Sequence, residues 1–340
     1  MSGFARKLIA WQRAHGRHGL PWQGTRDPYR VWLAEIMLQQ TQVAAVIPYY
    51  GRFLRAFPTL QALSRASLDR VLRLWSGLGY YARGRNLHRT ARLIATQRRG
   101  KFPGNSKDLR QFPGIGRSTA AAVAVFAFGE RAAILDGNVK RVLARHFDVE
   151  GEKAQWALAE ELLPANGIQS YTQALMDLGA TVCLRRAPRC RACPVAGTCA
   201  ARRDGEVEKL PSRKPKRPIP RRTATWLVLA HAGQVLLERR PPRGVWGGLW
   251  VFPELRGRSA RKFCGETLRC EIESPRPLAV IEHGFTHFRL TIHPFLCRVS
   301  GRRGESGGRL WIDMDEARSA AVPAPVRRLL ERLAAGEAVL

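Results

Sequence analysis

The sequence is short of acidic residues and has no long hydrophobic run. Its 27 Asp and Glu residues stand against 57 Lys and Arg residues, so the formal net charge is +30. The longest apolar stretch, about ten residues near positions 120–128, falls far short of the roughly twenty that a membrane-spanning helix needs. Residues 1–15 also lack the sustained apolar core of a signal peptide. We therefore expect a soluble protein of the cytoplasm.

The excess of positive charge indicates a polyanionic partner. On a folded protein, a net charge of +30 favours nucleic acid ahead of a membrane surface. The alternative is a solvated surface typical of an arginine-rich proteome, and the scattered arginines of residues 239–261 fit that interpretation.

The patterning divides the chain into two parts. Helical periodicity dominates up to about residue 182, with no convincing strand. Residues 201–222 then hold nine Lys or Arg and four prolines, which predicts an exposed basic linker. With 340 residues, the chain is long enough for two hydrophobic cores. We expect an all-α domain over residues 1–200 and an α+β domain over residues 223–340.

The second domain carries the strand signals. Residues 226–230 and 234–238 are predicted to form a hairpin, and residues 286–299 a long alternating strand. A helix is predicted over residues 325–335.

A glycine turn before the most apolar helix is the first candidate binding feature. Gly114 and Gly116 flank Ile115, and the helix predicted over residues 119–128 has almost no polar face, so it should hold the turn rigidly from the core. Backbone N–H groups of such a turn can bind a phosphate oxygen. The alternative is an ordinary turn between two helices.

Two isolated carboxylates are candidate catalytic groups. Asp27 followed by proline is a typical helix start, and the helix over residues 29–45 carries Glu35 on an otherwise mostly apolar element. Burial raises the pKa of a carboxyl, which then keeps the proton that a general acid needs. The alternatives are a buried Glu35 satisfied by a backbone or arginine partner, and an Asp136 that only caps the helix starting near Asn138.

Residues 77–83 form a second glycine turn, in which tyrosines and an arginine follow the glycines. This mixture suits close backbone approach and base stacking, and it also suits an ordinary packed turn.

Four of the seven cysteines are clustered with the spacing C-x6-C-x2-C-x5-C. Disulfides are not expected in an intracellular enzyme, so the pattern indicates a four-thiolate metal site. Zinc and a [4Fe–4S] cluster both satisfy the spacing. The remaining three, Cys264, Cys270 and Cys297, are scattered and are expected to be structural.

Together these motifs resemble the helix-hairpin-helix DNA glycosylases that carry an iron–sulfur cluster, and among them the MutY-type adenine glycosylases. The resemblance covers nearly the whole chain and rests on residues 31–42, 77–83, 112–119, 134–141 and the four-cysteine loop. It implies an all-α glycosylase domain followed by a Nudix-like domain. It also implies a [4Fe–4S] cluster rather than zinc at Cys183, Cys190, Cys193 and Cys199.

The resemblance assigns chemistry to the two carboxylates. Breaking an N-glycosidic bond needs a proton for the leaving base and negative charge near an oxocarbenium-like sugar. Glu35 would supply the proton and Asp136 the charge, with Asn138 in the same catalytic motif. Relatives that also cut the strand carry a lysine nucleophile where this chain has Ser118, so no Schiff base is available by that route. The expected activity is base removal alone.

The resemblance also implies how a base is reached and recognised. Gln40 and Tyr80 would be wedges, Gly114 and Gly116 would clamp a phosphate, and Lys140 would contact DNA without acting in catalysis. Trp22 and Gln173 would line the adenine pocket.

The Nudix-like domain is expected to recognise 8-oxoguanine opposite the adenine. Its recognition loop is Phe285, Thr286 and His287, with threonine in place of the family's serine. Residues 257–273 lack the clustered glutamates that hold Mg²⁺, so we expect no nucleotide hydrolysis.

The expected partner is therefore double-stranded DNA with A:8-oxoG or A:G mispairs, bound by a nucleoid-associated monomer that contacts no membrane. Two rival functions remain: an endonuclease III-like lyase for oxidised pyrimidines, and a DNA-binding module without catalysis.

Overall fold

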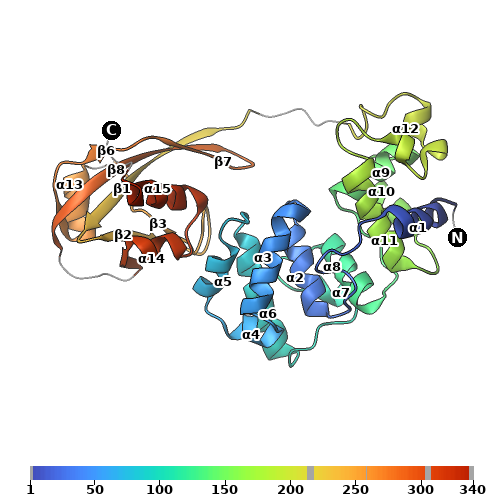
Figure 1. Cartoon of the computed structure of the whole chain (residues 1–340), viewed down its shortest axis with the longest axis horizontal. Coiled ribbons are helices and arrows are strands. Elements are labelled where there is room, and N and C mark those ends of the chain that lie inside the picture. Colours follow the sequence, from blue (N-terminus) through green and yellow to red (C-terminus); the bar gives the residue numbers. More distant parts are fainter. Residues whose placement is uncertain (1–2, 213–217, 258, 303–307, 337–340) are drawn as a thin grey trace. The chain divides into compact units, whose positions relative to one another are not determined.

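The computed structural model describes residues 3–212, 218–257, 259–302 and 308–336 (Figure 1). Part of the predicted linker, residues 213–217, lies outside the described residues, as do short pieces of both predicted domains. The chain forms two compact units, Met1–Arg65 with Asn86–Pro215, and Ala66–Arg85 with Lys216–Leu340. The second unit thus includes the helix and glycine turn before Asn86, which the sequence had placed in the first domain.

The described residues of the first unit contain helices and no strand, as predicted. Its elements are α1 (Gly3–His15), α2 (Pro28–Leu38), α3 (Val43–Ala56), α4 (Leu60–Arg65), α6 (Ala82–Gln97, which begins in the second unit), α7 (Ser106–Leu109), α8 (Arg117–Val123), α9 (Gly137–Phe147), α10 (Glu152–Glu161), α11 (Ile168–Asp177) and α12 (Ala200–Arg203), with π-helical turns at Ala124–Phe128 and Leu178–Val182 and 3-10 turns at Cys190–Ala192 and Ala196–Thr198. No helix among the described residues is long and apolar enough to cross a membrane.

The helix that carries Glu35 starts as predicted and ends early. Asp27 caps α2 by accepting a hydrogen bond from the Tyr29 N–H at 2.9 Å. The prediction of one helix over residues 29–45 is wrong, because α2 ends at Leu38 and Gln40 has a left-handed backbone with φ of 56°. The amide of Gln39 instead donates to the Gly114 carbonyl at 3.3 Å and to the Thr119 hydroxyl at 3.1 Å. These contacts with the glycine turn replace another turn of helix.

The apolar helix after the glycine turn is buried, as its composition predicts. Every residue from Ala120 to Val125 is buried, in α8 and the π-helical turn that continues it. The amino-terminal α1 packs beside α9 and α11 in the same core, through Leu8, Leu143 and Leu175. This core fixes the position of the turn at its amino-terminal edge.

The second unit is a mixed sheet with helices on both faces. Its elements are α5 (Leu68–Trp75), β1 (Arg221–His231), β2 (Gln234–Arg239), β3 (Trp250–Val251), β4 (Glu254–Leu255), α13 (Ala260–Phe263), a π-helical turn (Cys264–Leu268), β5 (Cys270–Ile272), β6 (Arg276–Pro277), β7 (Ile281–Gly284), β8 (Arg289–Arg302), β9 (Arg309–Asp313), α14 (Met314–Ser319) and α15 (Ala324–Ala334). The main strand order is β3-β2-β1-β8-β5, and β1 pairs in parallel with β8.

Alternate residues of β1 face different cores. Trp226 and Val228 pack with α14 and α15, whereas Leu227 and Leu229 pack with the side of the sheet that α13 covers. The predicted β1–β2 hairpin and carboxy-terminal helix are confirmed. The strand predicted from residue 286 starts at Arg289, because Phe285 N–H donates to the Phe288 carbonyl at 2.9 Å and closes a turn. The predicted all-α plus α+β architecture is confirmed.

Removing the cap of α2 should destabilise the helix that carries Glu35. Asp27→Ala leaves the Tyr29 N–H of α2 without its side-chain acceptor, and we expect a loss of about 1 kcal/mol in the free energy of unfolding. Urea unfolding would measure it, with Asp27→Asn as the control that keeps the cap. Equal losses in both variants would contradict the capping role.

Candidate functional site

The structure brings the two isolated carboxyl groups into electrostatic contact. Glu35 lies in α2 between the buried residues Ala34 and Ile36 and is itself half-buried. Burial raises the pKa of Glu35 to about 7, and the nearby charge of Asp136 adds to the rise. A carboxyl with this pKa holds its proton in an appreciable fraction of molecules at neutral pH.

Asp136 is held by the start of α9. One carboxylate oxygen, Oδ1, accepts hydrogen bonds from the Asn138 N–H at 2.9 Å and the Val139 N–H at 2.8 Å. The capping interpretation is therefore confirmed in its geometry. It does not conflict with a catalytic role, because both bonds go to the same oxygen and because a helix N-terminus stabilises negative charge.

Ser118 connects the hairpin helix to the Asp136 segment. Its hydroxyl oxygen accepts a hydrogen bond from the Leu135 N–H at 3.1 Å. This places a small polar group, rather than an amine, beside the residue that precedes Asp136.

The glycine turn has two glycines with different requirements. Gly114 has φ of +80°, and a Cβ there would come within 2.9 Å of the Asn86 Cβ. Gly116 is the N-cap residue of α8, and no atom lies within 4 Å of where its Cβ would be. Thus Gly114 is needed for backbone conformation and close packing, while Gly116 leaves open space at the mouth of the helix.

Both predicted wedge residues have left-handed backbones. Gln40 in the first unit has φ of 56° and is exposed, and Tyr80 in the second unit has φ of 45° and is 44% exposed. Such backbones are costly for residues other than glycine and cluster at functional sites. Arg83 supports the tyrosine turn by donating to the Leu78 and Gly79 carbonyls at 3.2 and 3.3 Å, with its guanidinium 5.4 Å from the Tyr80 ring centroid.

The two predicted pocket residues have separate partners. Trp22 packs edge-on against Tyr50, with ring centroids 5.4 Å apart. Gln173 donates to Asp177 Oδ1 at 2.9 Å, and the fully buried Asp177 also binds the Arg17 side chain at 2.6 Å. Sequence reasoning missed this ion pair, although an acid in the apolar segment 171–178 was a usable signal.

Arg141 links the Asp136 helix to the cysteine loop. Its guanidinium donates to Asn138 Oδ1 at 2.9 Å, the Gly179 carbonyl at 2.6 Å and the Cys183 carbonyl at 2.7 Å. A Cβ at Gly179 would lie 2.5 Å from the Asn138 Cβ, so the π-helical turn that precedes the loop packs directly on the start of α9. Sequence reasoning included Arg141 in a motif and gave it no role.

The four cysteines lie in one neighbourhood. Burial raises the pKa of the Cys193 thiol to about 11, and the charges of Cys183, Cys199 and Cys190 each add to the rise. No group of three or more His, Cys, Asp or Glu side chains in the described part of the chain is arranged to hold a metal ion. The four thiols therefore have the donor chemistry of a four-thiolate centre without being arranged as one. The other three cysteines, Cys264, Cys270 and Cys297, are buried in the second unit.

The predicted recognition loop is the exposed tip between β7 and β8. Phe285 stacks on Phe288 with ring centroids 4.3 Å apart, which anchors the turn. Thr286 and His287 are exposed, and the threonine hydroxyl lies 3.4 Å from His287 Nδ1.

Lys140, the predicted DNA contact in the first unit, pairs with Glu152 at 3.4 Å on the surface.

Replacing Glu35 should stabilise the protein at high pH. Its pKa in the folded protein, about 7, lies above the ordinary value of 4.5, so the stability contribution of the protonated carboxyl is present below pH 4.5 and is lost as pH rises through 7. Glu35→Gln removes that loss and should gain on the order of 1–3 kcal/mol at pH 8 and little at pH 4. Urea unfolding at both pH values, with the exposed Glu161→Gln as control, measures the difference. A gain that is equal at both pH values would contradict the raised pKa.

The chain is similar to known DNA repair proteins. Residues 33–164 match the model of the HhH-GPD superfamily of base excision DNA repair proteins, and residues 224–332 match the NUDIX domain. Adenine DNA glycosylase of Buchnera aphidicola subsp. Acyrthosiphon pisum is 33% identical over 338 residues, covering 96% of this chain and 97% of that protein. The Homo sapiens enzyme of the same name is 31% identical over 402 residues, covering 97% of this chain and 73% of its own.

Solved structures match the helical part of the fold. A thermostable thymine-DNA glycosylase has a TM-score of 0.56 and 29% identity, covering 59% of this chain and 95% of its own. Endonuclease III in a non-covalent DNA complex has a TM-score of 0.52 at 20% identity, covering 59% of this chain and 94% of its own, which supports the fold alone. Taken with the full-length relatives, these matches show that the chain belongs to the adenine DNA glycosylase family.

Proposed function

We propose that this protein removes adenine mispaired with 8-oxoguanine or guanine in duplex DNA and leaves an abasic site. The observation that carries the proposal is the raised pKa of Glu35, to about 7, beside the negative charge of Asp136. Paired carboxyl groups in contrasting surroundings suit hydrolysis through an oxocarbenium-like transition state. The names of the full-length relatives support adenine as the base that is removed.

In this proposal Glu35 is the general acid. Its protonated carboxyl delivers a proton to the adenine ring as the bond to the sugar breaks, so the base leaves neutral. Asp136, fixed through Oδ1 by two backbone N–H groups, places negative charge near the positive sugar. Asn138 is a positioning residue, because its backbone N–H donates to Asp136 and its side-chain oxygen accepts a hydrogen bond from Arg141.

The enzyme is proposed to remove the base without cutting the strand. A lyase needs an amine that forms a Schiff base with the opened sugar. At the position where a lyase carries its lysine, two residues after Gly116, this chain has Ser118. Its hydroxyl accepts from the Leu135 N–H and can supply only a polar contact to the sugar. This favours a monofunctional glycosylase over an endonuclease III-like lyase.

Duplex DNA is the proposed partner. The backbone N–H groups around Gly114 and Gly116 would bind a phosphate, and Lys140 would contact the backbone nearby. Gln40 and Tyr80 are the proposed wedges, which the left-handed backbones at two exposed side chains support. The flipped adenine would lie near Trp22 and Gln173.

The four-cysteine loop is proposed to hold a [4Fe–4S] cluster through Cys183, Cys190, Cys193 and Cys199. When bound, such a cluster supplies four iron–thiolate bonds that would fix this loop as one unit. Arg141 and Arg145 of α9 both donate hydrogen bonds to this loop. Arg145 donates to the Leu184 carbonyl at 2.6 Å and lies 3.5 Å from the Cys183 sulfur.

The second unit is proposed to recognise 8-oxoguanine through Phe285, Thr286 and His287. Two exposed polar side chains at the tip of an anchored turn suit contact with a base edge. Glu266 of the segment that corresponds to the Nudix helix pairs with Lys262 at 3.9 Å, and the segment offers no glutamate cluster for Mg²⁺.

We further propose that the protein is a monomer. Its domains would cover residues 1–200 and 223–340, joined by a basic linker over residues 201–222.

Strand-break analysis tests the activity. With a duplex carrying one adenine opposite 8-oxoguanine, we expect breaks in the adenine strand only after alkali, and none with Glu35→Gln. The control is Glu161→Gln, which should behave like the unaltered enzyme. Breaks before alkali would favour the lyase, and full binding without any breaks would favour a module that only binds DNA.

The pH profile of excision follows from the raised pKa. Because the general acid must be protonated, the single-turnover rate constant should be level below pH 7 and fall about tenfold per pH unit above it. Rates measured from pH 5 to 9 on the mispaired duplex check this. The control is the exposed Glu161→Gln variant, whose pH profile should match that of the unaltered enzyme. A rate that rises through pH 7 would contradict Glu35 as the acid.

A further inference from the structure

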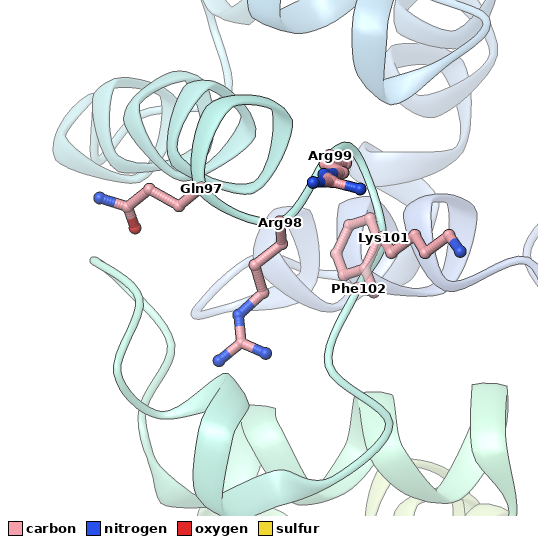
Figure 2. A pocket seen from close by; sticks show the side chains of 5 residues that line it. All are labelled: Gln97, Arg98, Arg99, Lys101 and Phe102. Carbon is pink, nitrogen blue, oxygen red and sulfur yellow. The ribbon is translucent and has the colours of Figure 1, made fainter.

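The carboxy-terminal end of α6 forms a basic depression that the proposed function does not use. It is open, has a volume of about 550 Å³, and is lined by Gln97, Arg98, Arg99, Lys101 and Phe102. Figure 2 shows Arg98, Arg99 and Lys101 pointing in different directions from the turn, with Lys101 beside the Phe102 ring and Gln97 pointing away from the helix. Three of these five residues carry positive charge, and no acid lines the depression.

The turn that carries these cations is fixed in place. The Gly100 N–H donates to the Ile94 carbonyl at 3.0 Å, and the Lys101 N–H donates to the Arg98 carbonyl at 2.9 Å. A Cβ at Gly100 would lie 2.6 Å from the Gln61 amide nitrogen on α4. The Phe102 ring packs edge-on against the buried Trp32, with centroids 5.5 Å apart. These contacts fix the backbone of the turn that forms the depression.

The charges of this turn are directed at solvent. Arg98 lies 3.9 Å from Asp108, whereas Arg99 and Lys101 are exposed and make no ion pair with the residues that the structure describes. Arg99 also has φ of 52°, a left-handed backbone that glycine or asparagine adopts at lower cost. This residue belongs to the helix C-cap that the Gly100 N–H closes with the Ile94 carbonyl, and the cap leaves the arginine side chain exposed.

The depression is separate from the glycine turn. Asn86, near the start of α6, touches the space next to Gly114, and Gln97 lies eleven residues farther along the same helix. At the rise of an α-helix this is a separation of about 17 Å. A phosphate held at Gly114 cannot also be held at Arg99.

We propose that this depression is a second nucleic-acid contact, which binds backbone phosphates of a DNA segment other than the one held at the glycine turn. Three cations on one turn, with a single amide, suit phosphate oxygens and do not read bases. The contact would lengthen the time the protein stays on undamaged DNA. The inference rests on DNA being the substrate, as proposed above, and its test does not require excision.

Salt-dependent binding to a long undamaged duplex tests the contact. Arg99→Ala with Lys101→Ala should reduce the slope of log K against log salt by about 1.8, or 0.9 for each of two phosphates. Single-turnover excision on a short mispaired duplex should be unchanged. Lys7→Ala with Arg13→Ala removes two exposed cations from α1 and is the matched control. Arg99→Lys with Lys101→Arg keeps the charge and should keep the slope.

The outcomes are distinct. A slope that falls only in the Ala pair, with circular dichroism unchanged, supports the contact. Equal slopes in the Ala pair and the α1 control overturn it. If inorganic phosphate raises the melting temperature of the unaltered protein and not of the Ala pair while the slope stays constant, the site binds small anions and the nucleic-acid assignment is wrong. Loss of excision in every variant and in the unaltered protein would instead reject the proposed function.

Discussion

The central interaction is the repulsion between two carboxyl groups that come from distant parts of the chain. Glu35 sits on a buried helix, and the charge of Asp136 adds to the rise in its pKa. Each carboxyl alone has a plain structural explanation, as a buried side chain or a helix cap. Together they hold a proton and a negative charge near each other, which suits the proposed cleavage of a glycosidic bond.

Helix α9 connects Asp136 to other parts of the first unit. Its first N–H groups fix Asp136, its Asn138 packs on Gly179, and its Arg141 holds the Cys183 segment. The cysteine loop therefore supports Asp136 through α9 and the guanidinium of Arg141. On the other side, Ser118 ties the hairpin helix to the same segment.

Sequence patterns predicted the parts whose cause is local. Asp27 with proline marked the start of α2, alternation marked the β1–β2 hairpin, and composition marked the buried helix after Gly116. Parts that depend on tertiary contacts were not predictable. The early end of α2 comes from Gln39 binding the glycine turn, the parallel pairing of β1 with β8 joins strands far apart in sequence, and the Arg17–Asp177 pair joins α11 to the loop after α1. The roles given to the site residues rest on motif resemblance and stay predictions.

The claim that matters most concerns where the proton of Glu35 resides. The direct measurement is a ¹³C NMR titration of the Glu35 carboxyl carbon, comparing the unaltered protein with Asp136→Asn. We expect a midpoint near pH 7 in the unaltered protein and a lower midpoint in Asp136→Asn, because the neighbouring charge has been removed. A midpoint near the ordinary 4.5 in the unaltered protein, or one that does not move in Asp136→Asn, would contradict it.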